Sequence, residues 1–439
     1  EPHIDLGEVD PRRFGPYANK VYTGRKNKEA FGHNFGIHYP GYEWPEARPA
    51  KTMPCYDRLN AAGAVWGAVY GWEIPLWFAP EGCEAKDTWS YRTFNSMPHI
   101  GAECRAVRET AGLFEMTPMA KFEVSGPGAE VWLNRILANR MPRKIGGIVL
   151  AHLLTHKGTI RCEFTVTRLG ETSFYLVGTP RGERHDFDVL QKTLPADGTV
   201  TLINVTAERG GLTLVGPKAR DILQDLVDGD LGNDAFPWMS AQALTVGLAS
   251  DVRMMRINYE GELGWELYHP IAYNLHLFEE ICRAGEVHGL KHCGYRAIES
   301  LRLEKSYRAI YRDLDLEHTA LEAGLDRFIK WDKDEFVGQQ ALLKQRDAGL
   351  KHKMVALKVE TVDADAWMNE SVFRDGRLVG RITSGATSHN IGNCLSMAYV
   401  ELDQATPGTP LEVQVLERRV PAIVIADSPY DPKNHRPRM

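Results

Sequence analysis

The chain has 439 residues, which is too long for one ordinary hydrophobic core and predicts two or three domains. Its hydrophobic fraction of 43% and charged fraction of 25% are those of a globular protein, so disorder of the bulk of the chain is excluded. A net charge of −6 argues against a general binder of nucleic acid or of anionic membranes, and no apolar run is long enough to span a bilayer.

The cysteines are odd in number and scattered, and none forms a Cys-x-x-Cys pair. They predict free thiols in a reducing compartment, which is the cytoplasm or, in a eukaryote, the mitochondrial matrix. We predict no metal site, because no pair of Cys or His at ligand spacing has a matching second pair. His152 and His156 stand four residues apart but belong to strand-like sequence, so we interpret them as surface or pocket histidines.

Residues 1–50 are rich in Pro, Gly, Tyr and charge, and they predict an extended arm with short helical pieces. No Gly-x-Gly-x-x-Gly motif follows a strand in the chain, so we predict no flavin site. Residues 106–114 read as a helix closed by Gly112.

A pattern of strand, Gly-Pro turn and helix occurs twice, at residues 121–138 and again at residues 212–226. Between these copies, alternation predicts strands at 148–154, 160–167, 173–177 and 199–205, and a helix at 184–192. The repetition predicts an α+β fold of two related halves rather than a parallel Rossmann sheet. Helices at 275–287 and 296–305 follow, and the short β runs between residues 354 and 425 predict a small C-terminal β-barrel.

Residues 257–270 read as two strand ends around a glycine-bearing turn. Tyr259 and Trp265 place aromatic faces beside this turn, and Glu266 adds a carboxylate. Such a group suits a flat heteroaromatic ring with N–H donors, because a carboxylate accepts two donors at once, as on the amino-pyrimidine edge of a pterin. On these residues alone, an ordinary hairpin with a partly buried glutamate remains the alternative.

The same stretch resembles the Tyr-Thr-Gly-Glu-x-Gly-x-Glu signature of the glycine-cleavage aminomethyltransferase (T-protein) family, with Glu260 in place of the family threonine. Its Leu-Gly-Trp-Glu-Leu-Tyr sequence is most similar to the folate domain of dimethylglycine and sarcosine dehydrogenases. The resemblance covers roughly residues 51–430, and the arm resembles the connector after the flavin domain of those enzymes. It implies an arm at 1–50, a folate-binding aminomethyltransferase-like domain at 51–335 and a β-barrel domain at 336–439.

The resemblance also implies a catalytic carboxylate facing the one-carbon position of bound tetrahydrofolate. Where the family has Asp, this chain has Glu163, whose extra methylene moves the carboxylate by roughly 1.5 Å. Arg161 and Thr165 share the strand parity of Glu163, whereas Cys162 should point the other way.

Tetrahydrofolate is the cofactor that the resemblance implies. Its expected contacts are Tyr259, Glu266, Trp265, Gly264 and Thr165. Three arginines are candidates for the anionic folate tail, namely Arg296, Arg302 and Arg381.

The leading functional hypothesis is tetrahydrofolate-dependent capture of the carbon released from an N-methylated glycine, of the dimethylglycine or sarcosine type, as 5,10-methylene-tetrahydrofolate. The expected partners are a small-molecule methyl donor and a flavin dehydrogenase domain or subunit. One alternative is a standalone demethylase that acts on a sulfonium or aryl methyl ether and gives 5-methyl-tetrahydrofolate. A second alternative is a catalytically inactive folate-binding module.

Overall fold

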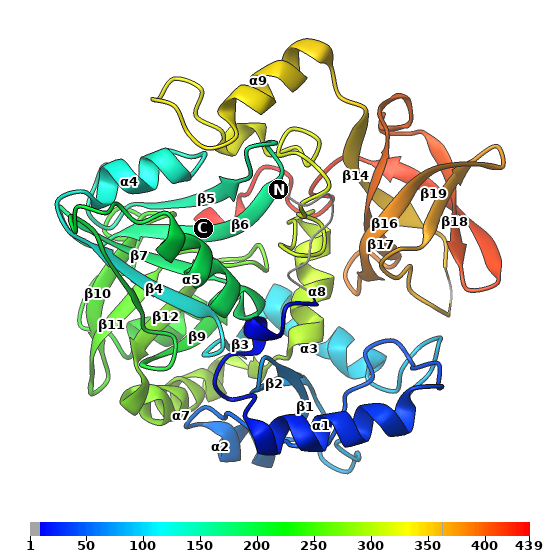
Figure 1. Ribbon diagram of the computed structural model, residues 1–439. Coiled ribbons are helices and arrows are strands. Elements are labelled where there is room, and N and C mark those ends of the chain that lie inside the picture. Colours follow the sequence, from blue (N-terminus) through cyan, green and yellow to red (C-terminus); the bar gives the residue numbers. More distant parts are fainter. Residues whose placement is uncertain (1–8, 362) are drawn as a thin grey trace.

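The computed structural model describes residues 9–361 and 363–439. These residues form two large β-sheets that lie beside each other and a closed six-stranded barrel on one side of them (Figure 1). The predicted α+β class and the predicted C-terminal barrel are confirmed.

The two sheets are built from related halves of the chain. In the first half the strand order is β5(Ile148–Leu154), β6(Ile160–Arg168), β7(Ser173–Gly178), β4(Ala120–Ser125) and β8(Thr201–Asn204), with helices α4(Ala129–Ile136) and α5(Glu183–Lys192). In the second half it is β10(Ala241–Val246), β11(Ala249–Met255), β12(Gly264–Pro270), β9(Arg209–Val215), β3(Ala111–Glu115) and β13(Leu290–His292), with helices α6(Ala219–Gln224) and α7(Asn274–Gly285). Apart from β3, which lies between β9 and β13, the strands of the second sheet are arranged in space and along the chain in the same order as those of the first sheet.

Helix α4 shows how sequence pattern becomes packing. Its buried residues are Ala129, Trp132, Leu133 and Ile136, which recur at helical spacing and cover one face of the first sheet. Such burial contributes roughly 25 cal/mol for each Å² of apolar surface removed from water.

The predicted helix at 106–114 is confirmed only over residues 106–109, and its closure by Gly112 is wrong. Helix α3(Met97–Glu109) ends before Gly112, which lies within strand β3. A Cβ on this glycine would lie 2.5 Å from the Val107 side chain and 2.9 Å from Cys293 Sγ. Gly112 is therefore required for close packing of a strand against a helix, not for a helix end.

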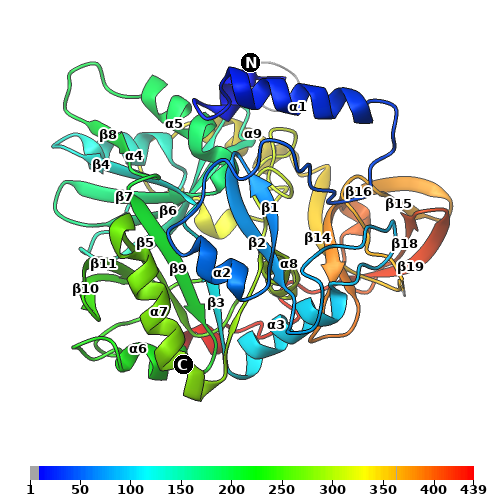
Figure 2. The same cartoon turned by 90° about the horizontal axis from the view of Figure 1, so that it is seen from below.

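The arm differs from its prediction in one respect. Its described residues contain a short 3-10 helix at Pro11–Phe14 and also a 14-residue α-helix, α1(Lys20–His33), which is longer than the predicted short pieces and whose first turn is capped by the Asn19 side chain. Figure 2 shows α1 beside the hairpin of β1(Ala64–Val69) and β2(Trp72–Phe78). The chain before α1 packs on this hairpin, since a Cβ at Gly71 would lie 2.6 Å from the Tyr17 ring.

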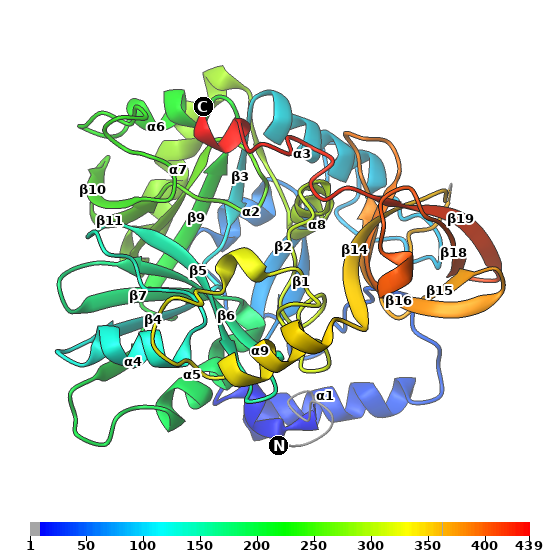
Figure 3. The ribbon, with the colours of Figure 1, turned by 90° about the horizontal axis from the view of Figure 1, so that it is seen from above.

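The remaining elements connect and close the fold. They are α2(Tyr56–Ala61), α8(Tyr295–Glu304), α9(Gln339–Ala348) and the barrel strands β14(His352–Val359), β15(Ser371–Arg374), β16(Arg377–Thr387), β17(Cys394–Glu401), β18(Pro410–Val415) and β19(Arg418–Ile425). After β19 the chain leaves the barrel and ends beside α6 (Figure 3), where the main-chain oxygen of Met439 accepts hydrogen bonds from Arg220 and Arg256. All seven cysteines are free thiols, and none of the described helices has the length and apolar character needed to cross a bilayer.

The repeated Gly-Pro turns generate a stability prediction. Gly126 has a φ of +119°, and a Cβ there would lie 2.3 Å from the Thr199 carbonyl oxygen. We expect Gly126→Ala to lower the free energy of unfolding by about 2–4 kcal/mol, because backbone strain and a clash with main chain add together. Urea titration of the purified chain measures this change.

Gly198→Ala is the matched control. Gly198 also has a positive φ, of +73°, but no atom lies within 4 Å of the added Cβ. Its cost is backbone strain alone, about 1 kcal/mol. Equal losses in the two variants would contradict the role of close packing at the Gly-Pro turn.

Candidate functional site

One face of each sheet is turned toward the other, and the region between these two faces is called the inner space. On β6, Glu163, Thr165 and Thr167 alternate with core residues and therefore lie on one face. The Thr167 hydroxyl lies 3.6 Å from the Met255 sulfur on β11, and Met255 is the cross-strand neighbour of Glu266 on β12. The faces that carry Glu163 and Glu266 are thus apposed.

A pair of tyrosines makes the second contact between these faces. Tyr175 on β7 is the cross-strand neighbour of Thr167, and Tyr268 shares a face of β12 with Glu266. The rings of Tyr175 and Tyr268 are fully buried with centroids 5.7 Å apart, and they meet edge to face. This geometry is a favourable one for aromatic pairs, and it ties β7 to β12 at one end of the inner space.

Glu163 is held by a histidine from the adjacent strand. His152 on β5 pairs directly with Glu163 in the antiparallel ladder, and its Nε2 lies 2.8 Å from Glu163 Oε2. The His152 side chain is 2% exposed, whereas that of Glu163 is 18% exposed. An imidazole N–H that donates to one carboxylate oxygen orients the carboxylate and leaves its other oxygen toward the inner space.

Glu266 has an unusual electrostatic environment. Burial raises the pKa of its carboxyl group to about 8, and the nearby carboxyl of Glu260 adds to this increase. The Tyr268 hydroxyl donates a 2.8 Å hydrogen bond to Glu266 Oε2, which partly offsets the increase by stabilising the ionised form. Burial therefore favours the protonated form of the Glu266 carboxyl group.

Tyr259 lies after the end of β11 and forms a further wall. Its hydroxyl donates a 2.6 Å hydrogen bond to the Arg308 carbonyl oxygen, and its ring stacks on Tyr307 with centroids 5.8 Å apart. Burial raises the pKa of Tyr259 well above its ordinary value, and the negative charge of Glu163 is among the groups that contribute.

Two of the predicted folate contacts lie elsewhere. Trp265 is 0% exposed and points to the opposite face of β12 from Glu266, where its ring meets Phe236 in the hydrophobic core. Gly264 faces the neighbouring strand, since a Cβ there would lie 2.7 Å from the Leu214 carbonyl oxygen. Of the predicted residues, Glu163, Thr165, Tyr259 and Glu266 belong to the walls of the inner space.

The three arginines considered for the folate tail are all paired with carboxylates. Arg302 is fully buried against Asp313 and Glu299, Arg296 binds Asp87, and Arg381 binds Glu317. A different cation, Arg161, shares the β6 face of Glu163. Its Nε is buried and has no hydrogen-bond partner among the described residues.

Sequence reasoning interpreted His152 as a surface or pocket histidine and did not pair it with Glu163, and it did not single out Tyr268. In the structure His152 is buried against Glu163. Folding the hairpin 148–167 about its glycine turn brings residue 152 opposite residue 163. The strand register could therefore have predicted that His152 lies beside Glu163. Tyr268 stands two residues after Glu266 and therefore on the same strand face.

Residues 55–333 match the GCVT N-terminal domain, and residues 352–431 match the glycine cleavage T-protein C-terminal barrel domain. The chain belongs to the glycine cleavage T-protein family. In addition, residues 1–52 match the central domain of FAD dependent oxidoreductases. The match to the T-protein family spans both sheets and the barrel.

Three proteins illustrate the relationship. Mitochondrial dimethylglycine dehydrogenase of Rattus norvegicus is 35% identical over 431 residues, which are 97% of this chain and 50% of the relative. A probable aminomethyltransferase of Thermococcus kodakarensis is 30% identical over 400 residues, covering 83% of this chain and 93% of the relative. The crystal structure of glycine cleavage system aminomethyltransferase T from Bartonella henselae has a TM-score of 0.74 at 27% identity, covering 87% of this chain and 98% of that one.

These similarities make the chain a folate-dependent aminomethyltransferase-type domain related to dimethylglycine and sarcosine dehydrogenases. T-proteins bind tetrahydrofolate, and the chain spans about half the length of the dehydrogenases that it matches.

The raised pKa of Glu266 generates a pH prediction for this chain. If its ionised carboxylate receives the N–H donors of a reduced folate, affinity increases from pH 6.5 to pH 8.5 and levels off above the pKa of about 8. Calorimetric titration with a stable reduced folate measures this profile.

Two variants sharpen the test. Glu266→Gln should weaken binding and remove the pH dependence, because the amide does not titrate. Tyr268→Phe removes the donor that lowers the pKa of Glu266, so the midpoint should move to higher pH. A wild-type affinity that is constant across this range would contradict the role of Glu266.

Proposed function

We propose that this domain binds tetrahydrofolate between the inner faces of β6 and β12 and loads it with the carbon released from an N-methylated glycine. The product is 5,10-methylene-tetrahydrofolate. The observation that carries the proposal is the apposition of the strands bearing Glu163 and Glu266.

Glu266 and its surroundings fit the pterin end of the cofactor. Among the described residues, only the Tyr268 hydroxyl donates a hydrogen bond to the Glu266 carboxyl group, and it donates to Oε2. The other oxygen, Oε1, is therefore available to a ligand. A pterin edge that offers two N–H donors favours the ionised carboxylate, since only the anion accepts from both. Ligand binding would therefore lower the raised pKa of Glu266.

The aromatic and basic residues nearby suit the rest of the ligand. The stacked rings of Tyr259 and Tyr307 offer an apolar wall to a flat heterocycle. Arg161 supplies a cation with an unsatisfied Nε on the strand that carries Glu163. We propose Thr165, two residues further along this face, as a polar contact of the folate.

Glu163 is the proposed catalytic group. Tetrahydrofolate supplies a nucleophilic nitrogen. Positive charge develops on the transferred one-carbon unit as its bond to the glycine nitrogen is replaced by a bond to the folate nitrogen. A carboxylate nearby stabilises this charge and accepts or returns a proton. The hydrogen bond from His152 holds the longer glutamate side chain in one orientation, which offsets the positional freedom added by its extra methylene.

The relatives support an N-methylated glycine as the source of the carbon. A dimethylglycine dehydrogenase matches nearly the whole chain, yet the chain spans half of that enzyme. We propose that a flavin dehydrogenase domain or subunit oxidises the substrate and that this chain captures the carbon. The match of residues 1–52 to a domain of FAD dependent oxidoreductases supports an arm that connects the two activities.

Mass analysis of the folate product separates this proposal from its alternatives. Tetrahydrofolate and an N-methylated glycine are incubated with the chain, with and without a flavin dehydrogenase. The expected product is 5,10-methylene-tetrahydrofolate that forms only when the dehydrogenase is present and forms faster with this chain than with the dehydrogenase alone. Formation of 5-methyl-tetrahydrofolate from a sulfonium or aryl methyl ether without the dehydrogenase would contradict the proposal, and folate binding without any product would favour an inactive module.

Substitution of Glu163 tests its role in the same assay. We expect Glu163→Gln to lower the rate of methylene transfer by about 10²-fold, because the variant loses the charge and the proton-transfer group. The dissociation constant for reduced folate should change little, since Glu266 and Tyr259 remain.

Glu412→Gln is the matched control. Glu412 is a half-buried glutamate on barrel strand β18, remote from both inner faces. This variant should retain the wild-type rate and affinity. A Glu163→Gln variant with the wild-type rate would remove Glu163 from the mechanism.

A further inference from the structure

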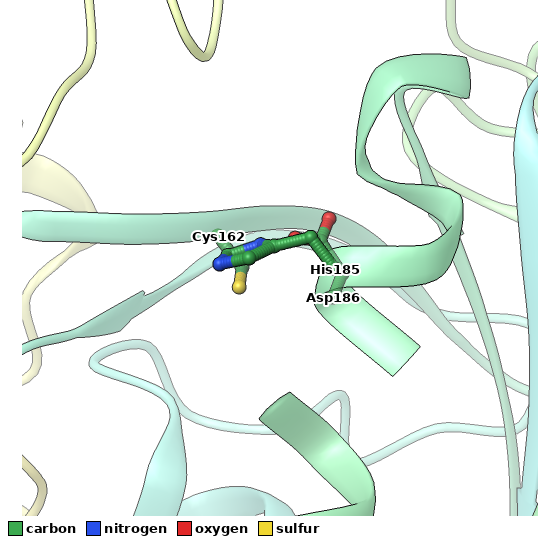
Figure 4. Close-up of side chains that lie close together, drawn as sticks. All are labelled: Cys162, His185 and Asp186. Atoms are coloured by element: carbon green, nitrogen blue, oxygen red, sulfur yellow. The ribbon is translucent and has the colours of Figure 1, made fainter. Parts of the chain in front are cut away.

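A second group of reactive side chains lies behind the strand that carries Glu163. Cys162 points to the opposite face of β6, toward the start of α5, where His185 and Asp186 converge on it (Figure 4). One ligand atom from each of the three residues lies within 4.8 Å of the other two. Cys162 and Asp186 are buried, whereas the His185 side chain is 32% exposed.

Asp186 is the least satisfied member of this group. Its Oδ1 accepts a hydrogen bond from the Tyr311 hydroxyl and lies 2.8 Å from His185 Nδ1. Its Oδ2 is buried and has no well-aligned hydrogen-bond donor among the described residues, although the Cys162 thiol interacts with this carboxyl group. A buried carboxylate oxygen without a donor is costly, and a cation is one group that removes the cost.

The backbone around Asp186 leaves room for this carboxylate. A Cβ at Gly182 would lie 2.2 Å from Asp186 Oδ2, so only glycine permits the observed side-chain position. Tyr311, which holds the other oxygen, has a φ of +66°, a conformation that non-glycine residues rarely adopt. Such strained positions concentrate at functional sites.

The three side chains form the donor set of a zinc-type cation. Thiolate, imidazole and carboxylate are ligands of Zn²⁺, and three protein ligands leave a fourth position for water. The hydrogen bond from Tyr311 to Asp186 is the outer contact that fixes a ligating carboxylate. Pairwise spacing in the sequence does not reveal this group, because its members come from a strand and a later helix.

We propose that Cys162, His185 and Asp186 bind a divalent cation of the zinc type. The cation replaces the thiol proton of Cys162, which is released to solvent. Bound metal ties β6 to α5 and thereby fixes the strand whose next residue is Glu163. The proposal is independent of the folate site, because metal binding is read without folate.

Cobalt titration tests the site directly. The 439-residue chain is freed of metal with a chelator and titrated with Co²⁺, whose thiolate complex absorbs in the near ultraviolet. We expect one equivalent of Co²⁺ to produce this absorption and Zn²⁺ to remove it. Cys162→Ser should abolish the absorption, and Asp186→Asn should weaken Co²⁺ binding by roughly 10- to 100-fold through loss of a ligand charge.

Two further variants control for folding. Cys104→Ser changes another buried cysteine and should retain the full absorption. His185→Gln alters the exposed member of the group, so it should fold, as circular dichroism checks, while Co²⁺ binding is weakened. A wild-type chain that gives no thiolate-to-cobalt absorption, or a Cys162→Ser variant that keeps it, would overturn the proposal.

Discussion

The apposition of two sheet faces fixes the position of every group in the candidate site. Side chains alternate along a strand, so the contacts of Thr167 with Met255 and of Tyr175 with Tyr268 decide which residues of β6 and β12 face inward. Glu163 and Glu266 face the inner space as a result. The residues beside them, Cys162 and Trp265, face outward, so β6 presents a carboxylate on one side and a potential metal ligand on the other.

Buried charges position the remaining wall of this space. Arg302 and Asp313 are both fully buried with their charged atoms 2.7 Å apart, and Arg302 also donates to the Tyr307 carbonyl oxygen. Asp313 accepts hydrogen bonds from Thr383 and Ser384 on the barrel strand β16. A buried ion pair of this kind adds little net stability but is costly to break, so it specifies one arrangement of barrel, loop and sheets.

Local pattern in the sequence predicts much of this structure. Alternation predicts the strands at 148–154 and 160–167, and short β runs predict the barrel. The repeated Gly-Pro turns indicate two related halves, and strand parity separates Glu163 from Cys162 correctly. The errors arose where distant contacts decide the outcome. Trp265 was grouped with Glu266 by proximity in the sequence although β12 turns them to opposite faces, and the burial of Arg302 depends on Asp313 from another segment.

The most direct measurement is a crystal structure of the chain with a stable reduced folate bound. We expect the pterin between β6 and β12, with its N–H edge within hydrogen-bond distance of the Glu266 carboxylate and its one-carbon position facing Glu163. The rings of Tyr259 and Tyr307 should contact the ligand. A folate bound outside this space, or a pterin whose N–H edge is paired with groups other than Glu266, would contradict the proposed site.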